Sequence, residues 1–208
     1  MKNQITKLVC LLLIVFIGHN NIFAQSDKSV KLLKELEGKY KLDDNNNITI
    51  SKVIDLPDLN KDEIYKRALT YFTYNYVNGE SVIQIDKKED GLIVGKGIYI
   101  NAHVGVSLVT TKIDTWHILR VDIKDNKIRV MLTLTEYRQT IYGGNTGPSV
   151  IHTPIATQYP INDKGLFKTV MSKAFYNSFK LAENTIDRFE KSLKEGNVDK
   201  KIENDNNW

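Results

Sequence analysis

The chain has 208 residues, of which 41% are apolar and 26% charged, with 29 basic residues against 25 acidic ones. This is the composition of an ordinary globular protein, and it excludes disordered, collagen-like and acidic-tail proteins. No biochemical activity can be read from the sequence, but export and an approximate fold can be predicted from it.

The first 24 residues have the pattern of a secretory signal peptide. Lys2 and Lys7 make the start positive, residues 8–17 form an apolar run, and the small residue Ala24 precedes a suitable cleavage point. We expect cleavage between Ala24 and Gln25 and a mature protein that is secreted or periplasmic. The alternative is a membrane anchor, for which the run is short, because about 18 or more apolar residues are needed.

Cleavage would change the charge and remove the cysteine. The leader holds two lysines and no acid, so the mature chain of 184 residues would keep 27 basic and 25 acidic side chains, a net charge of +2. This near balance gives no driving force for binding nucleic acid. Removal of Cys10 excludes a disulfide, a thiolate nucleophile and a cysteine-ligated metal in the mature protein.

After the leader, residues 25–47 are predicted to form an N-terminal extension. Its residues 29–37 have the spacing of a short helix that ends at Gly38. Residues 48–56 then alternate between apolar and polar side chains, which predicts a half-buried strand that begins the main domain. The apolar face of this strand carries Ile48, Ile50, Ile54 and Leu56.

A helix is predicted after Pro57. Asn60 and Glu63 have the spacing of a capping box, in which each side chain bonds to the backbone of the other residue. Apolar residues then recur at helical spacing up to Tyr76, and Asn78-Gly79 is expected to end the helix. The stripe consists of Ile64, Tyr65, Ala68, Leu69, Phe72 and Tyr76.

Strands are predicted at 82–86 and 92–100, joined by a turn at Glu89-Asp90-Gly91. Ile83 and Ile85 are expected on one face of the first strand. Gly95 and Gly97 share one face of the second, which leaves a bare patch where another element can approach closely. Residues 101–114 are compatible with either loop or strand.

The strongest prediction is a hairpin formed by residues 115–126 and 127–140. A two-residue turn at Asp125-Asn126 sets a register that brings the apolar faces of the two strands together. In that register the expected pairs are Ile123 with Ile128, Val121 with Val130, Leu119 with Leu132 and, on the polar face, Asp122 with Arg129.

Residues 142–160 are predicted to form a loop, and Asp163 to begin a long helix that runs to about Lys194. Such a helix is about 45 Å long, whereas a ten-residue strand is about 33 Å long, so one end should overhang the sheet. Ile186, Phe189 and Leu193 would then need another cover. We expect residues 30–36 to provide it; the alternatives are a second chain or a helix that ends near Ala182.

These elements predict an α+β fold of order β-α-β-β-β-β-α, in which a curved antiparallel sheet packs on the long C-terminal helix. The domain is expected over residues 48–195, followed by a polar, disordered tail at 196–208. The order is that of the TATA-binding-protein-like (TBP-like) fold, which the helix-grip ligand carriers share.

Three stretches resemble a family of secreted bacterial domains of unknown function, described as having a TBP-like fold. They are KVIDLPDLNKDEIYKRAL, SVIQIDKKEDGLIVGKG and HILRVDIKDNKIRVMLTLTEY, and together they span residues 52–137. The resemblance implies the fold and export. It implies no catalytic residue, because the family has no established activity.

No catalytic, cofactor-binding or metal-binding residue is predicted, and no cofactor. His103, His117 and His152 lack ligand spacing, and His117 shares the apolar face of its strand, so we expect a core or rim histidine there. The Gly-rich stretch 142–147 lacks the lysine of a phosphate-binding loop, which indicates a connecting loop. A basic face on the last helix is read as solvated; its residues are Lys164, Lys168, Lys173 and Lys180.

Three function classes stay open. We favour a non-catalytic module that binds an apolar small molecule or an envelope protein, with no nucleic acid and no membrane span in the mature chain. A structural or assembly component of the envelope is second, and an enzyme is third. A cavity between sheet and helix would favour the first class, an exposed apolar patch on the long helix the second, and a cleft holding polar groups of shifted pKa the third.

Overall fold

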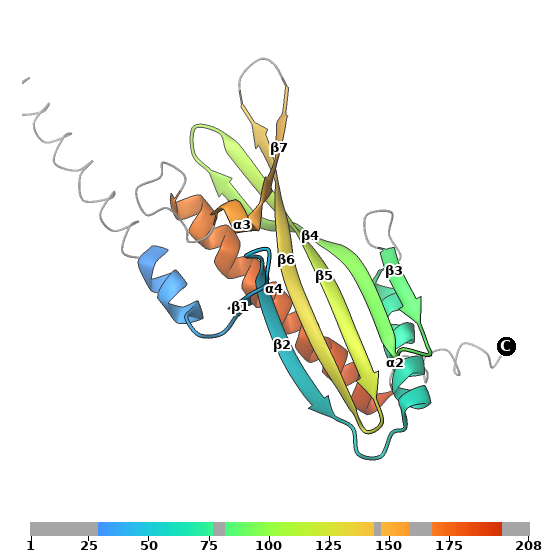
Figure 1. The fold of residues 1–208 in the computed structure, drawn as a ribbon. Coiled ribbons are helices and arrows are strands. Elements are labelled where there is room, and N and C mark those ends of the chain that lie inside the picture. Colours follow the sequence, from blue (N-terminus) through green and yellow to red (C-terminus); the bar gives the residue numbers. More distant parts are fainter. Residues whose placement is uncertain (1–28, 77–81, 144–146, 159–167, 197–208) are drawn as a thin grey trace, which may run out of the picture.

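The computed structural model describes residues 29–76, 82–143, 147–158 and 168–196 (Figure 1). The expected leader, the end of the first helix at Asn78-Gly79, the cap at Asp163 and the tail from residue 197 lie outside this range. Residues 29–36 are helical. The other elements are β1 (Lys41–Leu42), β2 (Ile48–Asp55), α2 (Lys61–Asn75), β3 (Val82–Lys87), β4 (Leu92–Val106), β5 (Thr110–Lys124), β6 (Lys127–Tyr142), β7 (Ser149–Pro154), α3 (Ile155–Gln158) and α4 (Lys168–Glu195).

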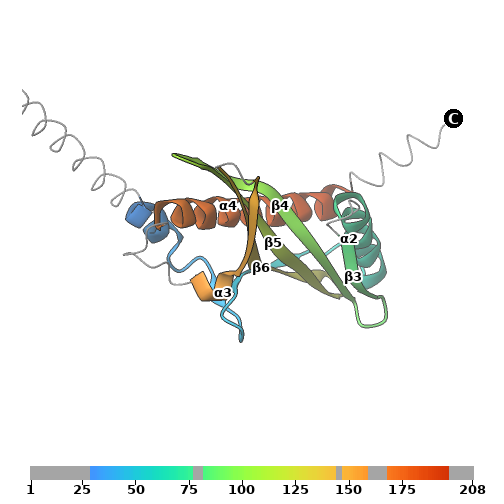
Figure 2. The same ribbon diagram turned by 90° about the horizontal axis from the view of Figure 1, so that it is seen from above.

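The strands form one antiparallel sheet of seven strands in the order β1-β2-β6-β5-β4-β3, with β7 also paired to β6. The first half of β6 pairs with β2 and its second half with β7, so these two strands lie end to end along the same edge. Figure 2 shows α4 running along the sheet and α2 beside one end of it. The α+β fold expected from the sequence is confirmed.

The β5–β6 hairpin has the predicted register, with Val121 opposite Val130 and Asp122 opposite Arg129. Asn126, the second residue of the turn, adopts the left-handed conformation (φ 63°), which asparagine tolerates better than most residues. Its carbonyl oxygen accepts a hydrogen bond from the Leu56 N–H at 2.7 Å. The turn is therefore tied to the connection between β2 and α2.

The first helix begins as predicted, but the capping box is only half formed. The Asn60 side chain accepts a hydrogen bond from the Glu63 backbone N–H at 2.9 Å. The Glu63 carboxylate does not return to Asn60 in the described structure; it accepts a hydrogen bond from Arg67 at 2.8 Å. An intrahelical ion pair at i,i+4 has replaced the second half of the box.

The predicted glycine patch receives aromatic rings from α2 and β5. A Cβ atom on Gly95 would lie 2.7 Å from a ring carbon of Phe72, and one on Gly97 would lie 2.8 Å from the ring of His117. Both distances are shorter than real Cβ atoms tolerate. The bare strand face therefore lets α2 and the His117 ring approach the β4 backbone.

Three local predictions were wrong or incomplete. Residues 101–114, which the sequence left open between loop and strand, are strand except for a turn at 107–109: β4 continues to Val106, and β5 begins at Thr110. The predicted loop at 142–160 contains β7 and the short helix α3. In β3, a bulge between Ile83 and Ile85 breaks the alternation, so that Ile83 packs on the core while Ile85 is exposed.

The expected overhang of the last helix is wrong. The central strands have 15 or 16 residues, about 50 Å, which is longer than the roughly 42 Å of α4 with its 28 residues. Ile186, Phe189 and Leu193 are buried, and the Phe189 ring lies 4.9 Å from the Tyr71 ring of α2. The cover is thus α2 and not residues 30–36.

The N-terminal segment packs instead on an earlier part of α4. The Tyr40 ring lies 5.6 Å from the Phe175 ring and 6.0 Å from the Phe179 ring. The Tyr176 hydroxyl donates a hydrogen bond to Glu35 at 2.9 Å, and Leu36 is fully buried. The expected extension is therefore part of the core.

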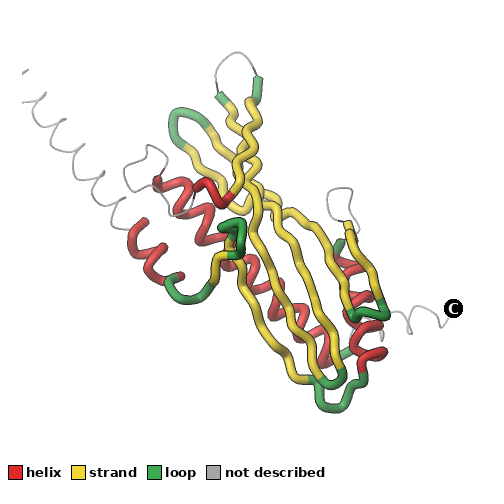
Figure 3. The backbone as a smooth tube through the Cα atoms, viewed as in Figure 1, coloured by secondary structure: helices red, strands yellow, loops and turns green. Residues whose placement is uncertain are grey.

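The sheet bends where three of its long strands become irregular at the same level. The β4–β5 register shifts between Tyr99 and His103, and the β5–β6 register shifts between Trp116 and His117. Such bulges bend strands and increase their twist. We call the sheet beyond this bend the distal arm: residues 100–113, 136–143 and 147–154. Figure 3 shows its two pairs of strands at the end of the sheet away from α2.

Candidate functional site

A buried histidine lies at the centre of the molecule. His117 points from β5 toward the helices, as its place among the apolar residues of that strand predicts, and is 4% exposed. Its Nε2 atom lies 3.0 Å from the Tyr76 hydroxyl, and its ring stacks on that of Tyr99 with 4.1 Å between centroids. The Tyr99 hydroxyl in turn lies 2.8 Å from the Thr185 hydroxyl of α4.

The titration of this cluster follows from its burial. Loss of solvation lowers the pKa of His117 to about 4, and the same cause raises the pKa of Tyr76 and of Tyr99 above the usual tyrosine value. All three groups are therefore uncharged at neutral pH. His117 and Tyr76 are buried and Tyr99 is partly buried, so the cluster forms a polar contact between the sheet and the helices. The expected core histidine is confirmed.

His103 and His152 are in more exposed surroundings than His117. His103 is half-buried on β4, and its pKa is lowered by loss of solvation and, less strongly, by the nearby Lys173 charge. His152 is exposed on β7, where its Nδ1 atom lies 2.7 Å from a Glu136 carboxylate oxygen. Within the described residues, no group of three or more His, Cys, Asp or Glu side chains is arranged to hold a metal ion.

The lysines expected on one face of the last helix are not equivalent. Lys164 lies outside the described residues, as does the Lys168 side chain. Lys173 is half-buried near His103. Lys180 forms an ion pair with Glu183 at 2.8 Å and lies over the Tyr176 ring at 5.8 Å.

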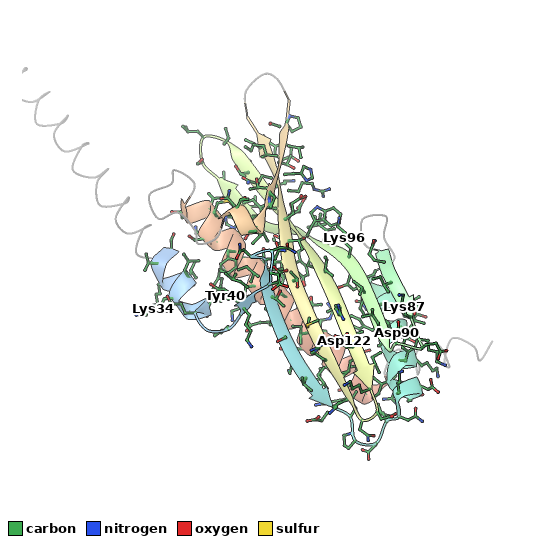
Figure 4. All side chains as sticks on the ribbon, viewed as in Figure 1. Lys34, Tyr40, Lys87, Asp90, Lys96 and Asp122 are labelled. Atoms are coloured by element: carbon green, nitrogen blue, oxygen red, sulfur yellow. The ribbon has the colours of Figure 1, made fainter. Side chains whose placement is uncertain are left out.

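The face of the sheet opposite the helices is uncovered by any described element and carries charged and aromatic side chains. Lys96 lies 4.5 Å from the Trp116 ring centroid, an attractive cation–π contact. Asp122 forms ion pairs with Arg120 at 2.8 Å and Arg129 at 3.0 Å. Figure 4 labels Lys96 and Asp122 on their strands.

One carboxylate joins three strands at the bend. The Asn101 backbone N–H, in a left-handed residue (φ 52°), donates to Asp114 Oδ1 at 2.6 Å. Arg138 of β6 donates to Asp114 Oδ2 at 2.9 and 3.0 Å. Asp114 is 7% exposed. It forms the floor of a shallow groove on the distal arm, together with Ile100, Lys112, Thr140, Tyr142, Val150 and His152.

The distal arm has a concentration of exposed apolar side chains. Thirteen large apolar residues are exposed in the described part of the chain, and eight of them lie in this arm. None of the thirteen lies on α4. The eight are Ile100, Val104, Val106, Leu108, Val109, Tyr142, Val150 and Ile151. A concentration of exposed apolar groups in one small region is a feature that interaction surfaces often have.

The two strand pairs of the arm touch at their ends. Gly143 follows β6 and lies against Val109 of the β4–β5 turn, so that a Cβ atom at Gly143 would clash with Val109 Cγ1. The Gly-rich stretch, read from the sequence as a connecting loop, thus includes one glycine that close contact requires. The remaining residues of that connection, 144–146, lie outside the described range.

With the geometry established, comparison with known proteins identifies the fold. Residues 51–138 match the family model described as a domain of unknown function (DUF4468) with TBP-like fold. The family resemblance inferred from the sequence is confirmed. The matched segment extends from within β2 to Arg138, so the N-terminal segment, β1, β7, α3 and α4 lie outside it.

Two crystal structures show the same fold at low sequence identity. A TBP-like protein from Parabacteroides distasonis is 12% identical with a TM-score of 0.55, and the match covers 75% of this chain and 97% of that one. A DUF4468 family protein from Bacteroides ovatus is 17% identical with a TM-score of 0.53, covering 76% and 91%. A comparison with curated proteins returns no match.

Proposed function

We propose that this protein is an exported, non-catalytic module that binds a partner through its distal arm. The observation that carries the proposal is the gathering of eight exposed apolar side chains on this one part of the sheet. Exposed apolar surface of this kind lowers solubility unless a partner covers it. A binding role accounts for its presence in a chain that otherwise has a well-filled core.

Two further observations support binding over the other two classes. The described part of α4 has no large exposed apolar side chain, which was the feature expected of an assembly component. Four described groups have a strongly shifted pKa. His117, Tyr76 and Tyr137 are buried, and Tyr99 is partly buried against the core, so none of them stands in an open cleft. An enzyme would place such groups in a cleft.

Photocrosslinking in intact cells tests the arm as the binding surface. A photoreactive amino acid replaces Leu108 in the arm and, as a matched control, Tyr74 of α2, which is also exposed. We expect an adduct of defined mass from position 108 and none from position 74. Identical adduct patterns from both positions, or no adduct from either, would overturn the assignment of the arm.

Export is tested on the same cells. The signal-like leader motivates it. Mass spectrometry of the protein in the extracytoplasmic fraction should find Gln25 at the N-terminus. An intact Met1 in the cytoplasmic fraction would refute export without bearing on the arm.

A further inference from the structure

We propose that the tip of the distal arm inserts into the surface of an anionic lipid bilayer. The inference rests on the proposed function, since it names the partner that the arm binds. The tip consists of the β4–β5 turn, residues 106–109, with Tyr142, Gly143 and Val150 beside it.

Apolar side chains project from the tip into solvent. Leu108 is fully exposed at the turn, and Val106 is 78% exposed. The contact between Gly143 and Val109 brings Tyr142 next to this turn, so the apolar groups of both strand pairs form one tip. A projecting turn with an exposed leucine and a neighbouring tyrosine has the composition of segments that enter the membrane interface.

Apolar side chains also lie on both faces of the arm. Val150 and Ile151 are consecutive residues of β7, so they point to opposite faces of the sheet, and both are about half exposed, at 54% and 46%. A protein partner docked on one face would leave the other face in water. A bilayer surrounds an inserted tip on all sides and can cover both.

The two stretches of chain around the tip carry positive charge and no negative charge. The sequence has no acidic residue between Gly91 and Ile113, and none between Tyr137 and Gln158. Lys112 lies directly behind the tip, with its ammonium group 5.2 Å from the Tyr142 ring centroid. When the turn at 106–109 enters the bilayer, Tyr142 and Lys112 behind it would place their polar ends among the lipid head groups. Because these two stretches carry no carboxylate and Lys112 adds a positive charge, the tip favours an anionic surface over a neutral one.

Insertion must be shallow. The backbone of the turn has one internal hydrogen bond, from the Ser107 N–H to the Val109 carbonyl oxygen at 3.0 Å. Other backbone groups at a turn need water or head groups as partners, which the hydrocarbon interior does not offer. None of the described helices combines the length and apolarity that crossing a bilayer would require. The tip therefore anchors the protein at the interface.

Vesicle flotation tests the proposal directly. The probes are phosphatidylcholine vesicles with and without phosphatidylglycerol. Every variant begins at Gln25, so that the apolar run at residues 8–17 cannot bind the vesicles itself. We expect the unaltered protein to float with the anionic vesicles. Leu108→Asp should reduce the bound fraction by about tenfold or more, because a charge replaces an inserted leucine.

Two variants separate the tip from general effects. Val53→Asp changes an equally apolar and 60% exposed residue outside the arm and should leave vesicle binding unchanged. Lys112→Glu should weaken binding to anionic vesicles more than binding to neutral ones. In an independent readout, Leu108→Trp should gain a blue-shifted fluorescence component that brominated lipids quench.

The outcomes distinguish the two proposals. Failure of the unaltered protein to bind anionic vesicles, or unchanged binding by Leu108→Asp, would overturn membrane insertion. If crosslinking from position 108 then yields a protein adduct, binding through the arm stands and its partner is a protein. If it yields none, both proposals fail.

Discussion

At the scale of single residues, two glycines of β4 determine how closely its neighbours in α2 and β5 can approach it. A methyl group at Gly95 would collide with the Phe72 ring at 2.7 Å, and one at Gly97 with the His117 ring at 2.8 Å. Overpacking of this kind typically destabilises by about 1–3 kcal/mol. The loss falls on the contact of β4 with Phe72 of α2 at Gly95 and with the His117 ring of β5 at Gly97.

Alanine substitutions at these positions give the first prediction. Gly95→Ala and Gly97→Ala should each lower the free energy of unfolding by about 1–3 kcal/mol in urea titrations. Gly105→Ala is the control, because its nearest neighbour, Val170 Cγ2, would lie at an ordinary 3.5 Å. Equal losses at all three positions would show that strand flexibility, and not close contact, explains the glycines.

The pKa of His117 predicts how stability depends on pH. The folded-state pKa of about 4 lies below the unfolded value of 6.5, so the unfolded chain binds more protons between these values. The contribution of neutral His117 to the free energy of unfolding is fully present above pH 6.5. It is lost as the pH falls toward 4, by about 3 kcal/mol in total.

Two variants check the assignment of this pH dependence. Denaturant titrations of His117→Leu across that range should lack most of the slope, while Tyr76→Phe, which keeps the histidine, should retain it. The pKa of His103 is also lowered, so the comparison is made as a difference from the unaltered protein. A His117→Leu variant with an undiminished slope would contradict the buried, neutral histidine.

At the scale of elements, the bend depends on one carboxylate. Asp114 accepts the Asn101 N–H and pairs with Arg138 while almost wholly buried. Removing the acceptor from a buried charged network costs more than removing a surface ion pair, because the remaining partners lose solvation without compensation.

Paired substitutions of two aspartates measure this difference. Asp114→Ala should destabilise the protein by about 2–3 kcal/mol. Asp122→Ala, which removes two ion pairs with more exposed arginines, should cost less than about 1 kcal/mol. Thermal unfolding of both variants provides the comparison, and a larger loss at Asp122 would mean that the bend does not depend on Asp114.

The elements also show how far the sequence alone could predict the structure. The β5–β6 hairpin was predictable because turn chemistry and apolar alternation independently gave the same register. The strand β7 was missed because Pro148 and Pro154 frame it, and an edge strand tolerates proline where a central one does not. Bulges, as at Ile83 and Ile85, are invisible to a period-two pattern.

The candidate site was less predictable than the fold. The inward direction of the His117 side chain could be predicted from the alternation of apolar and polar residues along its strand. The exposure of Val106 and Leu108 could not be predicted in this way. It depends on where the helices end relative to the strands, and β4 and β5 extend beyond the residues that alternate clearly. The cover of Phe189 by α2 likewise depends on a contact between residues more than 100 positions apart.

At the scale of the whole molecule, the N-terminal segment is part of the folded core. Leu36 is fully buried, and the neighbouring Tyr40 packs on two phenylalanines of α4. The segment therefore covers the helix around Phe175 and Phe179 and not around Phe189.

A pair of leucine substitutions tests this integration. Leu36→Ala should lower the free energy of unfolding by about 2–5 kcal/mol, the usual range for a fully buried leucine. Leu42→Ala, at a residue of β1 that is 43% exposed, should change it by less than about 0.5 kcal/mol. Similar melting temperatures for the two variants would place residues 29–36 outside the cooperative unit.

The sheet order has a consequence for folding kinetics. Strands β3 to β6 each pair with the next strand along the chain, whereas β2 pairs with β6 across about 80 residues. Local pairings form with a smaller loss of chain entropy, so the successive hairpins should assemble first and β2 should join late. Substitutions at Val121 or Val130 should then slow folding, while those at Ile54 should mainly accelerate unfolding.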